Sequence, residues 1–453
     1  MVTLMEKQLY PLSASQQIVK LQTTVTLFKR VGNIVFSLTF DEPLDRPTME
    51  KAIDLLFSRV DSLRTRFVKK DGKTMQYFAD EASHGAFGKT KILKSQDEVW
   101  KFVGAFRNGM LNPAKGKTMK VAFAKGPDGK DVLFVKISHF VADTYAIGII
   151  IEDLLKVYRA LLKGEELPAA PAAFESVLKK DIEFLQNDEL CGKDREFYNE
   201  YFKKHTEHPI YAGLHGNNCA YWLKQKNNGK FSIPYLFVKC DTAGYRYIIP
   251  RAIVEKVLAW CEAEKVTPAN FFFYAYALAC SLRNDRAPRQ LSLMLLNSRA
   301  TMSEKKCAGT KVQSVGLLTE FDYEKSFTEN VKTAIEEQTE QYRHTRMSYV
   351  EVQGLQHKTW GHSQITQLDN FCYSFIPFKA PEGVTMQVHS NGKGALAAYV
   401  ALMFDPDTLE VQANYDVQPI MTSAVELAEF QNILIRSIER LLAAPDSKLS
   451  EIL

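Results

Sequence analysis

The chain has 453 residues, of which 46% are hydrophobic and 24% are charged, and its formal net charge is +4. This length exceeds what one compact core ordinarily holds and predicts two lobes. No basic block with interleaved aromatic residues suggests nucleic-acid binding, and no apolar run approaches the roughly 20 residues that a membrane span requires. The N-terminal residues lack the apolar region of a signal peptide, so we expect a cytoplasmic location.

The seven cysteines narrow the chemistry further. They are scattered and odd in number, and none forms a Cys-x-x-Cys pair. A disulfide framework and a structural zinc site are therefore not expected. The Gly-x-x-x-x-Gly-Lys motif of phosphate loops and the Gly-x-Ser-x-Gly motif of serine nucleophiles are also absent.

The first part of the chain alternates predicted strands and helices. Apolar residues alternate over residues 34–40, which predicts a half-buried strand. The sequence Asp45-Arg46-Pro47 then begins a predicted helix, and the segment Leu63-Arg64-Thr65-Arg66-Phe67 follows it. The turn Gly126-Pro127-Asp128-Gly129 joins two apolar runs and predicts a β-hairpin.

The segment from Asp131 to Gly164 carries the most informative pattern. Residues 132–137 form a nearly unbroken apolar run, typical of a strand that is covered on both faces. Apolar residues then recur with helical spacing up to Leu162. His139 and Asp143 thus lie on a tight turn between a strand and a helix, where side chains can face a cleft. This spacing alone is weak, because it occurs by chance in about half of chains of this length and composition.

The second part of the chain begins after a Pro- and Ala-rich stretch. We interpret residues 167–180 as a linker between an N-terminal lobe, 1–166, and a C-terminal lobe, 181–453. A loop is expected over residues 208–229. Two Ser-x-x-Glu capping signals, a buried helix after Thr267-Pro268 and a strand that ends at Asn297-Ser298-Arg299 are also predicted. Strands and helices that alternate in both halves predict an α/β fold with mixed sheets.

Several segments resemble one family. SHFVADTYAIGIIIEDL, from residue 138, resembles the active-site segment His-His-x-x-x-Asp-Gly-Trp-Ser-x-Gly of nonribosomal peptide synthetase condensation domains and related HxxxD acyltransferases. YPLSASQQIVKL, from Tyr10, and SRVDSLRTRF, from Ser58, resemble the first two motifs of that family. SFTENVKTAIEEQTEQYRHTRMSYVEV resembles its late helix and the turn that follows. The resemblance covers essentially the whole chain.

The resemblance implies a chloramphenicol-acetyltransferase-like fold. We therefore expect two lobes in a V, each a mixed β-sheet with packed helices, with a tunnel between the lobes and segments of the C-terminal lobe that cross to the first. It implies a stand-alone acyltransferase without a permanently bound cofactor. The donor would be a phosphopantetheine thioester, on an acyl or peptidyl carrier protein or on coenzyme A, and the acceptor a small-molecule amine.

The resemblance also assigns roles to residues. His139 would accept or position the proton of the nucleophile, and Asp143 would hold the loop through an ion pair. Arg299 is the candidate partner, unless it is a solvent-facing charge at a strand end. Arg64 and Arg66 would belong to a segment that braces the loop. Four more residues are expected along the substrate tunnel: Ser138, Thr144, Tyr145 and Gly148. Gly148 could instead serve a close contact between helices.

Two departures from the family pattern leave alternatives open. Ser138 replaces the first histidine, and Thr144 replaces a glycine, where a β-branched residue could narrow the tunnel or disfavour a positive φ. The leading hypothesis is a condensation-type acyltransferase that forms an amide, with an ester as the second choice of product. The alternatives are a coenzyme A-dependent acyltransferase and a noncatalytic docking module with the same fold.

Overall fold

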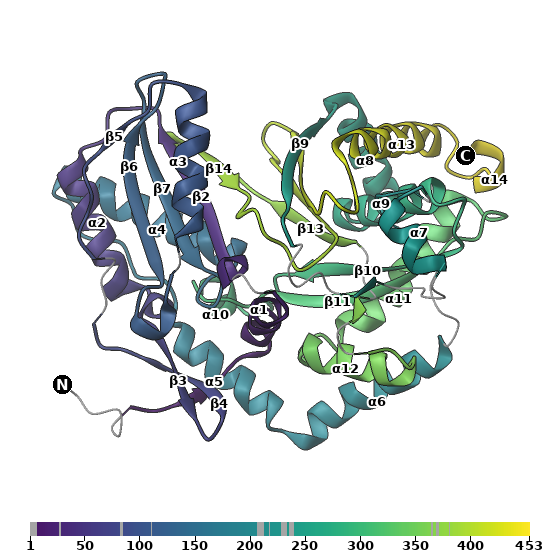
Figure 1. Cartoon of the computed structure of the whole chain (residues 1–453), viewed down its shortest axis with the longest axis horizontal. Helices are drawn as coiled ribbons and strands as arrows, with labels where there is room; N and C mark the ends of the chain where they lie inside the picture. The colour runs from purple at the N-terminus through teal and green to yellow at the C-terminus, as the bar shows by residue number, and fades with distance from the viewer. Residues whose placement is uncertain are drawn as a thin grey trace. The chain divides into compact units, whose positions relative to one another are not determined.

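The computed structural model describes residues 7–453 except 27–28, 82–84, 110, 206–212, 217, 228–232, 235–239, 364–365, 368–370 and 380. Contacts divide the chain into two compact units (Figure 1). Unit 1 comprises Met1–Lys193, Asn297–Gln313 and Ala380–Asn391, and unit 2 comprises Asp194–Leu296, Ser314–Lys379 and Gly392–Leu453. Both units combine β-sheet and helices, so the predicted α/β class is confirmed.

The main sheet of unit 1 has five strands in the order β14-β2-β7-β6-β5. Their bounds are β14 Val384–His389, β2 Asn33–Phe40, β7 Asp131–Ser138, β6 Met119–Lys125 and β5 Lys91–Ile92. Neighbours pair antiparallel, except that β5 is parallel to β6. The predicted hairpin is thus β6–β7, and β7 is the central strand. Strand β14 comes from late in the chain, which agrees with the expected crossing segment.

The two faces of this sheet are covered by different helices. Leu133, Val135 and Ile137 of β7 share a buried cluster with α2 (Arg46–Arg59) and α4 (Thr144–Lys163). Phe134 lies in a second cluster with α3 (Gln96–Asn108). Lys136 is also buried, and its ammonium donates to the carbonyl of Phe106 at 2.7 Å. Burial on both faces explains the nearly unbroken apolar run of β7.

Smaller elements complete unit 1. A three-stranded sheet has the order β1-β4-β3. The bounds are β1 Tyr10–Pro11, β3 Thr65–Lys70, β4 Lys73–Phe78, α1 Ala14–Val25, α5 Phe174–Leu185 and α10 Met302–Lys305, with single 3₁₀ turns at Lys29–Gly32, Asp61–Arg64 and Pro113–Lys115. Helix α6, Asp188–Lys204, continues from unit 1 into unit 2.

Unit 2 is built on a six-stranded sheet in the order β11-β10-β13-β15-β16-β9. Strand β13 is parallel to β10 and β15, whereas β16 is antiparallel to β15 and β9, so the sheet is mixed as predicted. The bounds are β9 Ala243–Ile249, β10 Arg289–Leu296, β11 Gln313–Glu320, β13 Cys372–Pro377, β15 Ala398–Phe404 and β16 Val411–Val417. A two-stranded sheet pairs β8, Ile233–Pro234, with β12, Thr366–Gln367.

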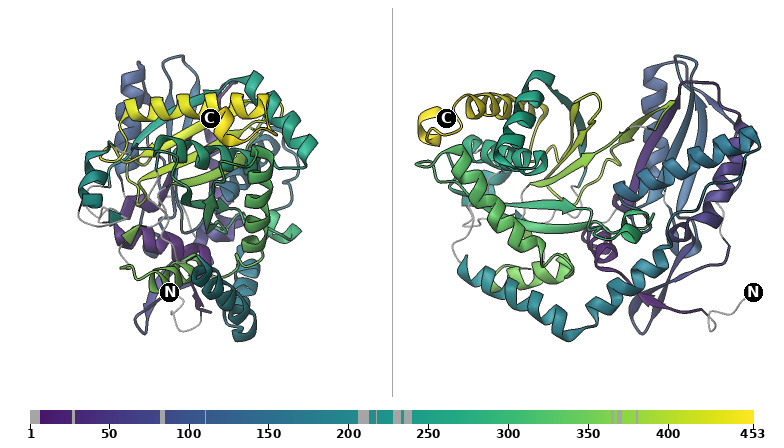
Figure 2. Two further views of the ribbon diagram at one scale, coloured as in Figure 1. Left: turned by 90° about the vertical axis from the view of Figure 1, so that its right-hand side faces the viewer. Right: turned by 180° about the vertical axis from the view of Figure 1, so that it is seen from behind.

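The helices of unit 2 gather around one buried helix. Helix α9, Pro268–Arg283, packs with α8, Arg251–Glu264, α11, Phe327–Tyr342, and α13, Ala424–Ala443 (Figures 1 and 2). The remaining helices are α7 Ala220–Asn227, α12 Tyr349–Thr359 and α14 Leu449–Ile452. Both predicted capping signals, at Ser326 and Ser423, form capping boxes that begin α11 and α13.

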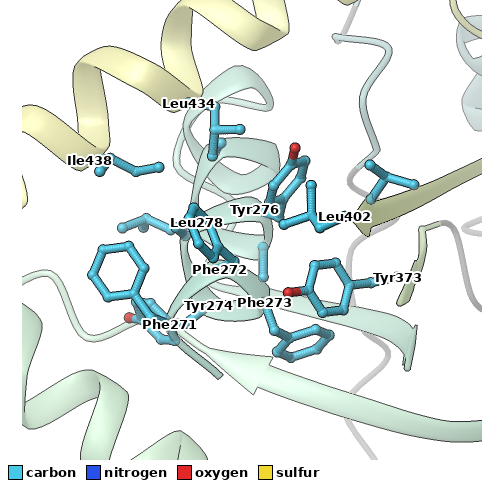
Figure 3. Packing of buried hydrophobic residues seen from close by; sticks show 14 of the residues in the cluster. Phe271, Phe272, Phe273, Tyr274, Tyr276, Leu278, Tyr373, Leu402, Leu434 and Ile438 are labelled. Atoms are coloured by element: carbon cyan, nitrogen blue, oxygen red, sulfur yellow. The ribbon is translucent and has the colours of Figure 1, made fainter. Parts of the chain in front are cut away.

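The core of unit 2 is rich in aromatic side chains. Phe271, Phe272, Phe273, Tyr274 and Tyr276 of α9 are all buried, and they share one cluster with side chains of β13, β15 and α13 (Figure 3). Because α9 is buried all round, its sequence lacks an amphipathic pattern. The prediction of a fully buried helix after Thr267-Pro268 is confirmed.

Two sequence-based boundaries differ from the structure. The expected linker, 167–180, includes the start of α5, whose Phe174, Val177 and Leu178 pack with Tyr10 of unit 1. By its internal contacts, unit 1 therefore reaches Lys193 and includes two later segments, Asn297–Gln313 and Ala380–Asn391. The lobes expected from the sequence were 1–166 and 181–453. The loop expected over 208–229 contains helix α7, although residues 208–212, 217 and 228–229 lie outside the described part.

No helix within the described residues combines the length and the apolar character that crossing a bilayer requires.

Candidate active site

The candidate site lies on the five-residue loop between β7 and α4 in unit 1. The amide of Ser138 donates to the carbonyl of Thr118 at 2.8 Å, and the amide of His139 donates to the carbonyl of Gly32 at 2.8 Å. The carbonyl of Ser138 then accepts from the amides of Val141 and Ala142 at 3.0 and 3.3 Å. These backbone hydrogen bonds form the tight strand-to-helix turn that the sequence predicted.

Asp143 ends this loop and caps helix α4. Its Oδ1 accepts from the amide of Ala146 at 2.8 Å, which satisfies one free amide of the first helical turn. Arg299 Nη2 donates to both carboxylate oxygens at 3.0 Å, and the amide of Lys311 donates to Oδ2 at 2.6 Å. One carboxylate thereby joins the start of α4 to two residues that follow 156 and 168 positions later.

Arg299 is enclosed by partners in unit 1. Besides the ion pair with Asp143, its guanidinium donates to the carbonyls of Asn297 and Gly309 at 2.9 and 2.7 Å. Its Cζ lies 4.6 Å from the centre of the Tyr145 ring, a cation–π distance. The side chains of Arg299 and Asp143 are only 1% and 4% exposed. The ion pair expected between these residues is present, and the alternative of a solvent-facing arginine is wrong.

His139 has an imidazole suited to remain neutral. Burial lowers its pKa below the ordinary value, although the charge of Asp143 and backbone hydrogen bonds at His139 and Ala142 oppose this effect. Its Nδ1 is buried and has no hydrogen-bond partner of ordinary geometry among the described residues. A neutral imidazole has one nitrogen without a proton, so the side chain can accept a proton near neutral pH.

The first two motifs of the sequence brace the loop. Gln16 Nε2 donates to the carbonyl of Phe140 at 3.1 Å and also contacts Gln76 at 2.7 Å. The ring of Phe140 lies 5.3 Å from that of Phe67. Gln16 and Phe67 therefore contact the loop directly, yet neither was predicted from the sequence as a functional residue. A signal was available, since Gln16 is the third residue after Ser13 in a capping box.

Arg64 and Arg66 of the second motif donate hydrogen bonds to backbone carbonyls. Arg64 donates to the carbonyls of Phe57 at 2.8 Å, Ser58 at 2.7 Å and Ala79 at 3.0 Å. Arg66 donates to the carbonyl of Thr65 at 3.0 Å, and burial lowers its pKa. Both arginines thus hold their own segment, while Phe67 of that segment makes the contact with the loop.

The four residues expected along a tunnel have different surroundings. Ser138 is 1% exposed at the end of β7. Thr144 is the first residue of α4, and its φ is not positive, so the expected backbone conflict does not arise. The hydroxyl of Tyr145 donates to the carbonyl of Lys305 at 3.3 Å, and its ring covers Arg299. A Cβ at Gly148 would meet no heavy atom within 4 Å, so a tight helix contact is not its role.

Within the described ranges, no group of three or more His, Cys, Asp or Glu side chains is arranged to hold a metal ion. All seven cysteines are buried free thiols.

The chain is similar to known proteins over most of its length. The model of the condensation domain family matches residues 6–452. Curated relatives include one of the linear gramicidin synthase subunits of Brevibacillus parabrevis, 26% identical over 167 residues, and one of the plipastatin synthase subunits of Bacillus subtilis (strain 168), 21% identical over 327 residues. These matches cover 35% and 71% of this chain but 3% and 12% of the relatives, so the chain spans a small part of their length.

Solved condensation domains share the fold. The first condensation domain of the calcium-dependent antibiotic synthetase, in complex with a substrate analogue, has a TM-score of 0.81 at 17% identity, with 98% of this chain and 99% of that chain covered. A mutant starter condensation domain of rhizomide synthetase, in complex with C8-CoA and Leu-SNAC, has a TM-score of 0.78 at 16% identity, with 98% and 96% covered. These structures show the shared fold, and the match to the family model establishes that the chain belongs to the condensation domain family.

Proposed function

We propose that this chain is a condensation-type acyltransferase. It moves an acyl or aminoacyl group from a phosphopantetheine thioester to an amine and forms an amide. The observation that carries the proposal is the partly buried imidazole of His139, with a lowered pKa, on a loop that the Asp143–Arg299 ion pair holds in place. Membership of the condensation domain family supports the same reaction.

The reaction needs little covalent help from the protein. The amine nitrogen attacks the thioester carbonyl, the carbon–sulfur bond breaks, and the leaving thiolate takes a proton. His139 accepts or positions the proton that the amine loses, while the fold orients the two substrates. Asp143 acts as a positioning residue, because its two oxygens already accept hydrogen bonds from Ala146, Arg299 and Lys311.

The four residues expected along a substrate tunnel have different proposed roles. Gly148 lies beside open space and can leave room for a substrate, whereas Tyr145 covers Arg299 and supports the ion pair. Ser138 and Thr144, which depart from the family pattern, fit their places without strain, since Ser138 ends β7 and Thr144 begins α4. The backbone conflict at Thr144 that would have supported a noncatalytic docking module is therefore absent.

The donor is proposed to be bound to an acyl or peptidyl carrier protein. Condensation domains work with carrier-protein domains, and the curated relatives include components of the gramicidin and plipastatin synthases. Free coenzyme A is the second candidate, because one solved condensation domain of the same fold holds C8-CoA. The proposal needs neither a permanently bound cofactor nor nucleic acid, and it keeps the sequence-based expectation of a cytoplasmic location.

The test is acyl transfer by the wild-type protein. Purified protein is mixed with an acyl-carrier or an acyl-coenzyme A donor and a panel of amines, and the products are identified by mass spectrometry. An amide that forms only with the protein present supports the proposal. If carrier contacts orient the donor, acyl-carrier gives the higher catalytic efficiency, and equal efficiencies would favour the coenzyme A alternative. If no donor gives any amide, the proposed function is wrong. The docking-module alternative is then tested by capture of a protein partner.

A further inference from the structure

A second charged cluster lies beside the Asp143–Arg299 pair. Lys311 is 5% exposed, and its ammonium lies 2.9 Å from a carboxylate oxygen of Asp181 on α5 and 3.0 Å from one of Glu304 on α10. The backbone amide of the same residue donates to Asp143 Oδ2 at 2.6 Å. All of these residues belong to unit 1. Lys311 therefore joins a buried ionic cluster to the carboxylate that holds the His139 loop.

The chain before Lys311 is fixed by contacts that do not involve its side chain. Cys307 forms an isolated bridge with Ala172, and the carbonyl of Ala308 accepts from the Ser62 hydroxyl at 2.8 Å. A Cβ at Gly309 would lie 1.9 Å from Phe174, so the close approach there requires glycine. Lys311 follows these fixed residues and lies two positions before β11, which begins at Gln313.

The Glu304 carboxylate beside Lys311 stays ionised in any ordinary assay. Burial would raise the pKa of Glu304, but the backbone amide of Thr301 and the ammonium of Lys311 outweigh burial and lower this pKa to about 2. A buried cation with two anionic partners has little freedom to change its rotamer, since any other position would leave charges unpaired. The side chain therefore fixes the position of the Lys311 backbone as well.

We propose that Lys311 is a positioning residue of the active site. Its ammonium, held between Asp181 and Glu304, keeps the Lys311 amide on the Asp143 carboxylate, and this keeps the His139 loop in the geometry that proton transfer requires. The inference rests on the proposed acyl-transfer function and adds Lys311, Asp181 and Glu304 to the residues on which that function depends.

The kinetic test uses Lys311→Met, which keeps most of the aliphatic stem and removes the charge. A small displacement of a catalytic group costs up to about a hundredfold in rate, so we expect kcat to fall by about ten- to a hundredfold. KM for the amine should stay within about twofold, because substrate contacts are unchanged. Lys311→Arg, which keeps a cation between the two carboxylates, should restore most of kcat. Lys325→Met is the matched control, since it removes an exposed lysine that pairs with Asp322 at 3.6 Å.

Hydrogen exchange gives a readout that does not need activity. The amides of Ala146 and Lys311 both donate to Asp143, so in Lys311→Met peptides that cover 138–148 and 299–313 should exchange faster. Peptides from α9 should keep wild-type protection, because a local change does not alter opening of the core of unit 2. If the wild type transfers no acyl group, the proposed function fails, while the exchange result still decides the structural link.

Two outcomes would overturn the proposal. In the first, Lys311→Met melts at a lower temperature but keeps wild-type kcat and wild-type exchange in both loop peptides, which would make Lys311 a stabilising residue only. The second outcome applies where the Lys311→Met protein does not fold. Asp181→Asn then takes its place, because it removes one of the two partners and should change kcat and local exchange in the same direction by a smaller amount. Wild-type values for Asp181→Asn would contradict the proposal.

Discussion

Unit 1 contains two buried arginine–aspartate pairs with similar chemistry and different consequences. Arg299 and Asp143 have side chains that are 1% and 4% exposed, and Arg59 and Asp153 have side chains that are 11% and 6% exposed. Arg59 donates to both oxygens of Asp153, at 2.9 and 2.6 Å, and to the carbonyl of Pro168. Both pairs therefore join an arginine to both oxygens of a buried carboxylate, although Arg59 is somewhat more exposed than Arg299.

The difference is the place of the carboxylate along the chain. Asp143 is the N-cap of α4, four residues after His139, and accepts a backbone amide from Lys311 as well. Asp153 lies in the middle of α4, and its pair joins that helix to the end of α2. A buried ion pair affects function when its carboxylate also fixes a reactive loop, and otherwise it affects only the stability of the fold.

The largest stability effect is expected for Asp143→Ala. This change leaves the Arg299 guanidinium buried without its anion and should lower the free energy of unfolding by about 3 to 5 kcal/mol. Activity of the folded fraction should fall too, because the loop loses its cap and its link to Lys311. Asp143→Asn should be milder. Denaturant unfolding combined with acyl-transfer rates measures both effects, and a stable but inactive Asp143→Ala protein would contradict this account.

A double-mutant cycle sharpens the assignment of the pair. Arg299→Ala should resemble Asp143→Ala in both stability and activity, and the double variant should be less destabilised than the sum of the two by about 0.5 to 3 kcal/mol. The reason is that the second change removes a charge that the first has already left unpaired. Additive losses in equilibrium unfolding would show that the two side chains do not interact.

The second pair supplies the control. Asp153→Ala should destabilise the protein by about 1 to 3 kcal/mol, because a buried arginine loses its acceptor. Its kcat, measured well below the melting temperature, should equal that of the wild type, since the hydrogen bonds of Asp153 within the described part of the chain join it to Arg59 on α2. A fall in kcat as large as that of Asp143→Ala would break the comparison between the two pairs.

The smallest effect is expected for Thr144→Gly, at one of the two positions that depart from the family pattern. Thr144 begins α4 with an ordinary backbone conformation, so Thr144→Gly removes no required geometry. It should cost at most about 1 kcal/mol through the greater freedom of glycine in the unfolded chain, with kcat changed less than tenfold. A gain of activity above a hundredfold would mean that Thr144 obstructs the substrate and that this chain is a weakened member of the family.

The sequence predicted the local features well because they depend on neighbouring residues. The order of β7, loop and α4, the buried helix α9 and the capping boxes at Ser326 and Ser423 all follow from patterns within about 20 residues. Even the N-cap role of Asp143 was accessible, since an aspartate directly before a helix is a common cap. Arg299 is a candidate partner of Asp143 only because the family resemblance implies an ion pair and because a predicted buried strand ends at Arg299.

The remaining features depend on contacts between distant parts of the chain. Lys311 meets Asp143 across 168 positions, and Gln16 meets Phe140 across 124. Spacing in a sequence carries no information on such pairs, because it says nothing of how strands are ordered in a sheet. The same limit explains why the expected linker includes the start of α5, because the partners of this helix, Tyr10 and Cys307, lie far away in sequence.

The central claim is that His139 accepts the proton in acyl transfer, and single-turnover kinetics test it most directly. His139→Ala should reduce the rate of transfer by about 10² to 10⁴-fold while the protein keeps its thermal melt, and Ser138→Ala should cost far less, because a hydroxyl is not basic enough to act in its place. Burial lowers the pKa of His139, so wild-type activity should be lost on acidification only as the pH falls through a value below that of an ordinary histidine. A weakly basic amine as acceptor keeps titration of the substrate out of this profile. A folded His139→Ala protein that transfers the acyl group at the wild-type rate would contradict the account.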